Sequence, residues 1–340
     1  MRKLVKRVRL PILTLGACLL AASASWGAVT EVFLRAATVT KTMPDGRQVV
    51  LWGFAQDPNG STQTGVVTVP GPALTLPPGP TQQDLLIHLR NTLAEPVSII
   101  VPGLTSVQPL GDPQRNPDNR IRAFTHEVAP GATADYRWNN VPAGTYLYHS
   151  GSHPAKQVQM GLYGALAKPN TATQAYAGAP THQGEVTLLF SAIDADLHDA
   201  VATGNYGLGQ AVSSTLKYAP QYFMINGQCY TAGQPALPAV TLGAGGASRT
   251  VLLRLLNADI DYHVPVLNGA YLDVVAEDGK LYPFKRTQNQ VWLPALKTMD
   301  AYWTADAAGT FPLFDRRLGL QSGPNLPGGM LTYLTVAAAP

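Results

Sequence analysis

Cysteine is nearly absent from this sequence, which contains only Cys18 and Cys229 among 340 residues. Charged residues are scarce as well, at 13%. Long stripes of apolar residues at helical spacing are missing, which argues against a helical bundle. No basic patch interleaved with aromatic residues is present, so we expect no nucleic-acid partner. Glycine and proline are frequent, with 32 and 28 residues, and they favour short strands joined by turns.

The N-terminus has the order of a secretory signal peptide, with cations first, then an apolar run over residues 10–24, then small residues. This run is too short for a membrane span and no other segment is long enough, so we expect no transmembrane span in the mature protein. Cleavage after Ala24 or after Gly27 suits the small-residue rule. Cys18 also ends a sequence that resembles a lipoprotein box, but ordinary cleavage is favoured because the apolar run before it is short. We predict a signal peptide over residues 1–27 and export to the periplasm, the cell surface or the medium.

Removal of the signal peptide changes the charge and the thiol content of the chain. It takes away five cations and no acid, and subtracting five charges from +3 leaves −2, so the apparent basicity disappears. Cys229 becomes the single cysteine, so an exported chain that could have used disulfides has no intrachain one. We therefore expect packing alone to hold the fold together.

The expected strands fall into two regions. Alternation of apolar and polar residues and the spacing of turn signals predict first-region strands at residues 31–40, 48–54, 85–89, 97–101, 135–138 and 145–148. A second set of strands begins at residues 185–190. The only helix we predict is a short one over residues 195–202.

Residues 169–184 are rich in Pro, Ala, Thr and Gly, which is the composition of a linker. About 310 mature residues suit two domains of roughly 140 to 155 residues each. We therefore predict an all-β chain with one β-sandwich domain at residues 29–168 and a second at residues 185–340.

Residues 144–166 read GTYLYHSGSHPAKQVQMGLYGAL and are the most informative stretch of the chain. They resemble the end of the first domain in the multicopper oxidase superfamily. In that family a Gly-Thr-Tyr-x-Tyr-His-Ser-His strand is followed about eight residues later by Gly-Leu-Tyr-Gly. The resemblance implies two tandem cupredoxin-like domains, each a Greek-key β-sandwich of the plastocyanin-like type.

Other segments carry the same resemblance. Residues 69–72 and 84–91 are similar to the opening of a multicopper oxidase domain. Three further segments, at residues 222–227, 253–258 and 275–279, are similar to strands of the family's second domain. Together these matches cover nearly the whole mature chain.

The family's copper ligands are mostly replaced. Its first domain supplies two histidines from the strand named above, and here His149 stands at the first ligand's place while Gly151 stands at the second. His153 restores the second ligand if Gly151 and its neighbour Ser152 are a two-residue insertion. The family's other first-domain motif is His-Trp-His-Gly, and here Ile100 and Pro102 replace its two histidines.

A count of ligands limits the copper content further. The resemblance implies about ten histidines and one cysteine for the four coppers of a complete oxidase, because such centres use imidazole and thiolate ligands. This chain has seven histidines. Cys229 has no neighbouring histidine, and Ser150 stands where a nitrite-reductase-like first domain has its cysteine. We expect no blue copper site and at most one copper ion per chain.

The candidate copper ligands lie on one short segment. His149, His153 and Met160 could bring two imidazoles and a thioether to one copper ion, and His126 could add a third nitrogen from a nearby strand. The alternative is structural. His149 is then a hydrogen-bonded core residue, His153 an exposed loop residue, Met160 ordinary packing, and His126 a half-exposed strand residue paired with Glu127.

The remaining polar candidates favour structural roles. Asp194, Asp196, His198 and Asp199 form an acidic cluster that we expect to cap and solvate the short helix. We expect His263 to be a buried histidine with satisfied hydrogen bonds. Cys229 has no cationic neighbour in the sequence and is expected to be an inert buried residue.

The sequence supports three functions. The first is an exported binding protein that holds at most one copper ion at His149 and His153 and serves in copper handling or electron transfer, with a redox protein as partner. The second is an oxidoreductase of the multicopper oxidase type that completes its copper centres in a homo-oligomer, as the resemblance implies. The third is a metal-free structural surface module, because a fold alone does not fix function.

Overall fold

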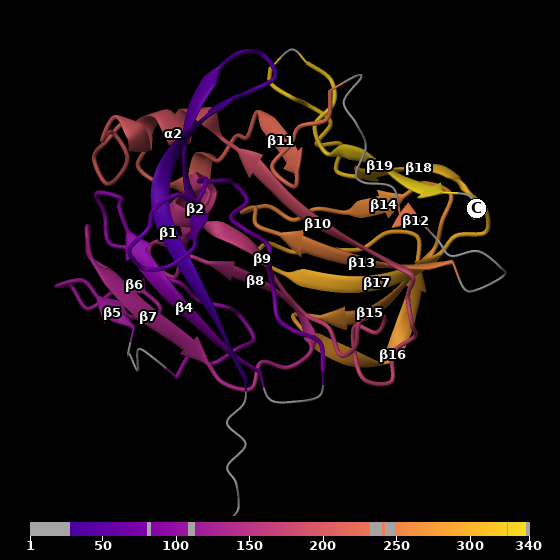
Figure 1. Cartoon of the computed structure of the whole chain (residues 1–340). Coiled ribbons are helices and arrows are strands. Elements are labelled where there is room, and N and C mark those ends of the chain that lie inside the picture. The colour runs from indigo at the N-terminus through magenta and orange to yellow at the C-terminus, as the bar shows by residue number, and fades with distance from the viewer. Residues whose placement is uncertain are drawn as a thin grey trace, which may run out of the picture.

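The computed structural model describes residues 28–79, 83–107, 113–231, 240–241, 249–324 and 326–337. Within these ranges most of the regular structure is strand (Figure 1). The predicted all-β fold with two β-sandwich domains is confirmed. The predicted signal peptide and Cys18 lie outside the described residues.

The first domain is a sandwich of two sheets. Its larger sheet has the strand order β2-β1-β4-β7 and its smaller sheet the order β3-β9-β8, while β5 and β6 form a separate hairpin. These strands are β1 (Ala28–Thr42), β2 (Gln48–Asp57), β3 (Leu74–Thr75), β4 (Gln83–Asn91), β5 (Gln114–Arg115), β6 (Ile121–Ala123), β7 (Thr133–Trp138), β8 (Gly144–His149) and β9 (Tyr163–Lys168).

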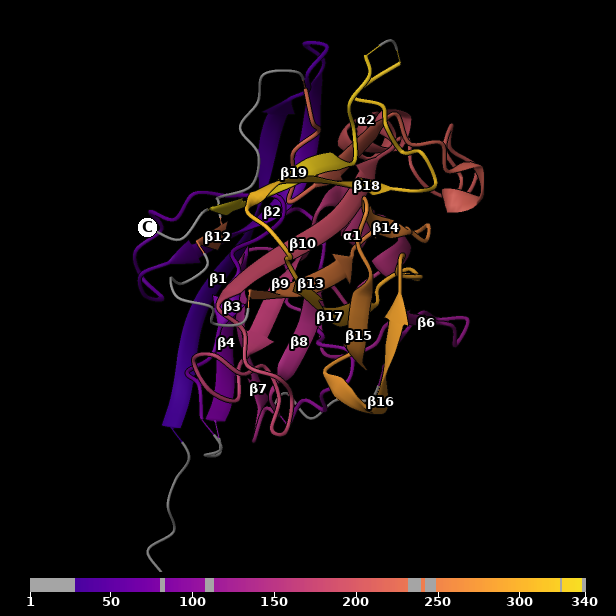
Figure 2. The ribbon, with the colours of Figure 1, turned by 90° about the vertical axis from the view of Figure 1, so that its right-hand side faces the viewer.

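The second domain also has two sheets. A six-stranded sheet has the order β11-β10-β13-β17-β15-β16, and a four-stranded sheet has the order β12-β19-β18-β14. The two sheets share one apolar core, in which Leu255 of β13 and Leu334 of β19 are both buried, as in two sheets packed face to face; Figure 2 shows them turned by 90° from Figure 1. The strands are β10 (Gly184–Ile193), β11 (Tyr222–Ile225), β12 (Val240–Thr241), β13 (Thr250–Asn257), β14 (Pro265–Leu267), β15 (Leu272–Glu277), β16 (Lys280–Gln288), β17 (Thr298–Thr304), β18 (Gly309–Asp315) and β19 (Leu331–Ala337).

In the described ranges, three short helices connect these strands. They are α1 (Pro154–Met160), α2 (Ala195–Ala202) and the 3₁₀ helix η1 (Thr215–Lys217). The predicted helix over residues 195–202 is confirmed as α2. The sequence analysis missed α1, which begins with a proline in its first turn, a position where the missing N–H is not needed.

One predicted strand is wrong. Residues 97–101 form no continuous strand and pair only through isolated bridges, Val97 with Val128 and Ile100 with His149. The segment changes partner between these two bridges, so no uninterrupted ladder can form. It nevertheless places Ile100 directly beside the end of β8.

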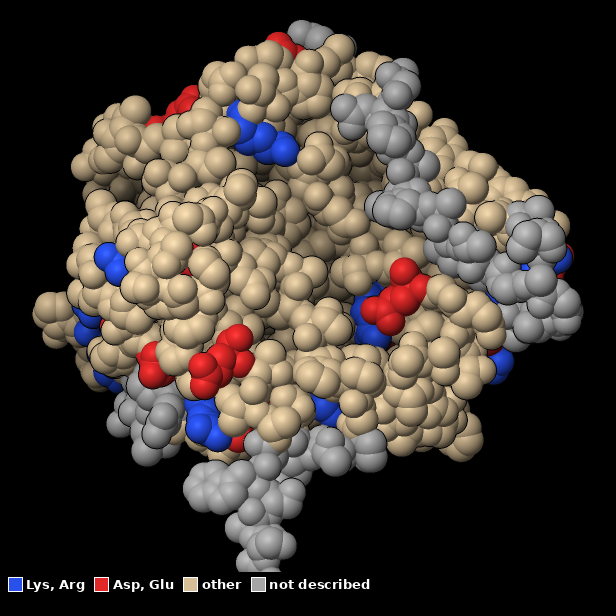
Figure 3. All heavy atoms as spheres, in the orientation of Figure 1, with Lys and Arg blue, Asp and Glu red and all other residues tan. Residues whose placement is uncertain are grey.

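Each domain has its own apolar core. Leu85, Ile87 and Trp138 are fully buried in the first core, and Leu253, Leu255 and Leu313 in the second. Leu197 of α2 packs into the first core although it follows the second domain's first strand. Figure 3 shows few charged side chains on the face seen in Figure 1, in line with the low charge content of the sequence.

The two domains meet along β8, which contacts β13 and β17 (Figure 1). At this junction the hydroxyl of Thr145 accepts a hydrogen bond from Arg254 Nη1 (2.6 Å) and donates one to Asp300 Oδ1 (2.6 Å). Arg254 also forms a two-pronged ion pair with Glu185. Because Arg254 and Asp300 are each only 1% exposed, this network ties the domains together in a site that excludes water.

Candidate metal centre

Strand β8 delivers His149 to the junction between the domains. Successive side chains of a strand point to opposite faces. Tyr146 and Tyr148 face the first core, whereas Leu147 packs with Leu189 and Leu256 of the second domain. His149 has the same parity as Leu147, so its ring lies on the face of β8 that is turned toward the second domain, and it is only 2% exposed.

The His149 ring is held in one tautomer. Its Nδ1 lies 2.9 Å from the carbonyl oxygen of Ser150, and because a carbonyl can only accept, Nδ1 carries the proton. Nε2 is therefore left with a lone pair, and it is buried without a hydrogen-bond partner. Burial lowers the pKa of His149 to about 4, although the bond to Ser150 partly offsets this, so the ring is neutral at physiological pH. A neutral imidazole whose other nitrogen donates to a carbonyl is the usual form of a metal-binding histidine.

The loop after His149 is fixed by buried side-chain hydrogen bonds. The hydroxyl of Ser150 donates to Gln157 Oε1 at 2.6 Å, and Gln157 Nε2 donates to the carbonyl of Pro96 at 2.9 Å. The hydroxyls of Ser98 and Ser152 bond to each other at 3.1 Å. The protein's own polar groups therefore hold this loop in shape.

His153 lies at the far end of this loop and is exposed. It is the N-cap residue of α1, its backbone has a left-handed φ of 39°, and its side chain caps no helix N–H. The ring lines a surface pocket of about 380 Å³ together with Phe124, Lys156 and Tyr206. Partial burial and the nearby Lys156 charge lower its pKa, so the ring is readily neutral and able to bind a metal ion.

The other two predicted ligands are placed elsewhere. Met160 is fully buried in the first core with Tyr148 and Leu162, on the opposite face of β8 from His149. His126 is exposed, and its carbonyl accepts a hydrogen bond from Tyr136. The expected pairing of His126 with Glu127 is not seen, because Glu127 bonds to Arg122 instead at 2.8 Å.

The positions of the missing family ligands are filled by packing. Ile100 and His149 exchange two backbone hydrogen bonds of 2.9 and 3.0 Å, so their side chains lie on the same face. A Cβ added to Gly151 would lie 2.9 Å from Ile100 Cγ2 and 3.0 Å from Ser98 Oγ. An imidazole at position 151 therefore has no room in this structure.

Cys229 lies in β11's neighbourhood as a buried thiol. Its thiol is buried, and burial raises its pKa to about 12 despite the opposing effect of the Lys41 charge. It packs in an apolar cluster with Met43 and Met224. Among the described residues, no group of three His, Cys, Asp or Glu side chains that could hold a metal ion includes it.

The described side chains thus match the ligand set of a complete oxidase poorly, but they provide a single imidazole ligand for a metal ion. In the part of the chain that the structure describes, no three His, Cys, Asp or Glu side chains are grouped so that they could hold a metal ion. His149 offers one buried nitrogen donor, and His153 is the next imidazole along the same loop.

Asp194 and His263 have structural roles, whereas His198, like His149, has a buried Nε2 without a hydrogen-bond partner. Asp194 caps α2 by accepting from the N–H groups of Asp196 and Leu197, as expected. His198 is buried and its Nδ1 lies 2.9 Å from the carbonyl of Val50. His263 is buried with both ring nitrogens bonded, which was also expected.

Several of these contacts were missed by the sequence analysis. Ser98, Ser152, Arg254 and Asp300 belong to polar networks that join segments far apart in the chain. No local pattern marks such residues. A lone arginine inside an apolar strand, as at Arg254 in β13, was the one available signal.

Comparisons with known proteins agree with this fold. Residues 56–168 match a multicopper oxidase family model. A blue copper oxidase from Nitrosomonas europaea superposes with a TM-score of 0.67 at 19% identity, covering 91% of this chain and 86% of that one. A copper nitrite reductase from the same organism gives 0.65 at 15% identity, with 91% and 94% coverage. A laccase from Botrytis aclada gives 0.63 at 22% identity, with 92% and 54% coverage.

A comparison with curated protein sequences gave no match. None of the helices in the described ranges has the length and hydropathy needed to cross a membrane. The predicted resemblance to the multicopper oxidase family is confirmed for residues 56–168, and over nearly the whole chain the two-domain fold is similar to that of the blue copper oxidase. At these identities the solved structures establish the fold alone.

Proposed function

We propose that this protein is an exported copper-binding protein that holds at most one copper ion per chain and serves in copper handling or electron transfer. His149 is the anchoring ligand and His153 the second. The observation that carries the proposal is the buried, unpartnered Nε2 of His149, whose tautomer is fixed by the Ser150 carbonyl. Leaving a buried polar atom unpaired is unfavourable by about 1–3 kcal/mol, so a ligand for that atom stabilises the site.

The residues support binding better than oxygen reduction. Copper supplies one-electron redox chemistry when it is bound, and an oxidase needs a thiolate-ligated copper to accept electrons. Cys229 lies in an apolar cluster and belongs to no potential metal-binding group among the described residues. Ile100 and Pro102 offer no donor atoms at the places of two family histidines. The chain's own contribution is to present a neutral imidazole in a dry site and to hold it in one orientation.

The test is copper stoichiometry in matched variants. The mature chain, His149→Ala, His153→Ala and the control His126→Ala are loaded with copper, desalted and analysed for metal. We expect about one copper per chain in the wild type and in His126→Ala, less than a tenth in His149→Ala, and weakened retention in His153→Ala. The control is matched because His126 is exposed and makes no side-chain bond among the described contacts.

One outcome contradicts the proposal, and two others point to the alternative functions. Copper retained equally in all four proteins would remove His149 from the site and contradict the proposal. Copper below a tenth per chain in the wild type would favour the metal-free surface module. Phenol oxidation by a copper-loaded oligomer would favour the oxidoreductase that completes its centres across subunits.

A further inference from the structure

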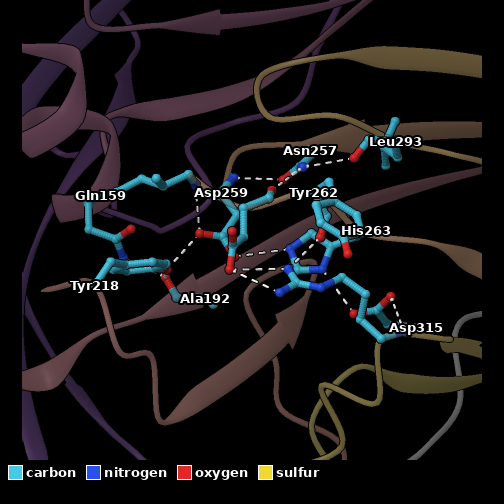
Figure 4. A network of polar contacts seen from close by, with 12 residues as sticks. Gln159, Ala192, Tyr218, Asn257, Asp259, Tyr262, His263, Leu293 and Asp315 are labelled. Atoms are coloured by element: carbon cyan, nitrogen blue, oxygen red, sulfur yellow. Dashed lines mark hydrogen bonds and ion pairs between the residues drawn. The ribbon is translucent and has the colours of Figure 1, made fainter. Parts of the chain in front are cut away.

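His263 lies between two buried aspartates (Figure 4). Its Nε2 is 3.0 Å from Asp259 Oδ2 and its Nδ1 is 3.0 Å from Asp315 Oδ2. All three side chains are 1% exposed. Because each ring nitrogen faces a carboxylate oxygen, both nitrogens need a proton to donate. The arrangement is that of a buried imidazolium between two carboxylates.

The carboxylates are also bonded at their other oxygens. Asp259 Oδ1 accepts from the Tyr218 hydroxyl at 2.6 Å and from a backbone N–H at 2.7 Å. Asp315 Oδ1 accepts from the N–H groups of Val264 and Arg317, at 2.8 and 3.2 Å. Such bonds favour the ionised form, and together with His263 they hold the pKa of Asp315 below its usual range against the effect of burial.

Among the described residues, the His263 ring makes ion pairs only with Asp259 and Asp315. It stacks on Phe190 of β10 with centroids 5.9 Å apart. The neighbouring charges serve other contacts, since Arg317 pairs with Asp261 and lies over the Tyr262 ring. Burial opposes the charge on His263, but the two aspartates outweigh it and raise its pKa. The titratable or charged groups around the ring are thus Asp259, Asp315, Tyr218, Asp261, Tyr262 and Arg317. Beyond them, Tyr163 lies near Asp259, and Asp194 lies near Tyr218.

This cluster is connected to α1. The Tyr218 hydroxyl lies 3.4 Å from the carbonyl of Ala192, and the same carbonyl accepts from Gln159 Nε2 at 2.6 Å. Gln159 is in α1, the helix that begins at His153. The single hydroxyl proton of Tyr218 goes to Asp259, so Tyr218 and Gln159 meet at the Ala192 carbonyl, and this contact links the His263 cluster of the second domain to α1 (Figure 4).

We propose that Asp259, His263 and Asp315 form a protonation lock, in which the imidazolium holds the second domain and α1 in place and its deprotonation at alkaline pH releases them. Without the proton, one ring nitrogen becomes an acceptor that faces a carboxylate, and a buried charge loses its partner. Removing one member of a buried ion pair is strongly destabilising, because the remaining charge is left uncompensated. The lock acts whether or not copper binds to the His149 loop.

The direction of the pH effect follows from the raised pKa of His263. Its contribution to stability is fully present below the unfolded-state pKa of about 6.5 and is lost as pH rises through the folded-state pKa. Over that interval the native state holds one more proton than the unfolded state. The unfolding equilibrium constant therefore increases up to about tenfold per pH unit.

The test compares unfolding midpoints in urea from pH 5 to 9.5 for the wild type and His263→Gln. We expect the wild-type midpoint to fall above about pH 6.5, and the His263→Gln profile to lack this fall. His88→Gln is the matched control, because His88 also pairs with an aspartate, at 2.7 Å from Asp135, but in the first domain. It is expected to keep the wild-type profile. Parallel profiles for the wild type and His263→Gln would overturn the proposal.

A measurement on the wild type alone covers the case in which His263→Gln does not fold. The ¹⁵N shifts of the His263 ring are expected to report two protonated nitrogens at pH 7. Amide exchange in residues 154–160, corrected for its intrinsic pH dependence, is expected to accelerate as that proton is lost. A neutral ring at pH 6, or an exchange rate in α1 that does not follow the titration, would contradict the lock.

Discussion

Copper held through His149 is expected to resist acid. An imidazole with an ordinary pKa of about 6.5 is mostly protonated at pH 5, and proton competition alone weakens its metal affinity roughly thirtyfold relative to a fully neutral ring. Burial lowers the pKa of His149 to about 4. The same competition then weakens affinity less than about twofold at pH 5. Lowering the pH from 7 to 5 should therefore leave nearly all of the His149 contribution intact.

The assay is a copper titration against a competing chelator of known pH dependence, at pH 7, 6 and 5. His153→Ala is titrated beside the wild type, because the exposed ring of His153 adds its own proton competition in the intact protein. Circular dichroism at each pH confirms that the protein is folded. This check is needed because a protein that buries a histidine in its neutral form loses stability as the pH falls below about 6.5. A thirtyfold loss of affinity at pH 5 in folded His153→Ala would refute the assignment of His149 as the anchoring ligand.

Three substitutions test the packing around the site by urea denaturation. Ser150→Ala removes the hydroxyl that donates to the buried Gln157 Oε1, and it should lower the free energy of unfolding by about 1–3 kcal/mol. The control Ser61→Ala, at an exposed position, should change the free energy of unfolding little. Equal effects of the two substitutions would contradict the loop network. Thr145→Val removes the hydroxyl between Arg254 and Asp300 and should lower the free energy of unfolding by a similar amount. The control Thr310→Val, at an exposed position, should have almost no effect. An unchanged urea midpoint for Thr145→Val would show that the domain junction does not depend on this hydroxyl. Gly164→Ala places a Cβ 2.3 Å from the buried Tyr148 ring and should lower the free energy of unfolding by about 1–3 kcal/mol. In the control Gly60→Ala the nearest contact of the added Cβ is at 3.5 Å, so the free energy should change little. An unchanged free energy of unfolding in Gly164→Ala would mean that the Tyr148 ring can shift.

The sequence predicts the strands well where alternation is strong. Residues 48–54 and 145–148 lie within β2 and β8, and both strands are mostly buried, β8 on both of its faces. Helix α1 was missed because its seven residues are too few to show a helical period. The segment at residues 97–101 has the composition of a strand but changes pairing partner within five residues, which no local pattern reports.

The chemistry of the site was predictable only in part. The sequence singles out His149 and the loss of most family ligands. It does not predict that Nε2 is buried and unpaired, because that depends on the second domain and on the Ser150 carbonyl. Likewise, His263 was expected to be satisfied, but its partner Asp315 is 52 residues away and is brought to it by the pairing of β14 with β18.

In the proposed site, one copper ion binds through His149 and not through a thiolate. Optical and EPR spectra of the copper-loaded mature chain, recorded beside His149→Ala and His126→Ala, test this most directly. We predict no intense visible thiolate-to-copper band, and imidazole nitrogen couplings that disappear in His149→Ala and persist in His126→Ala. An intense blue band, or couplings that survive in His149→Ala, would contradict the claim and move the metal to another site.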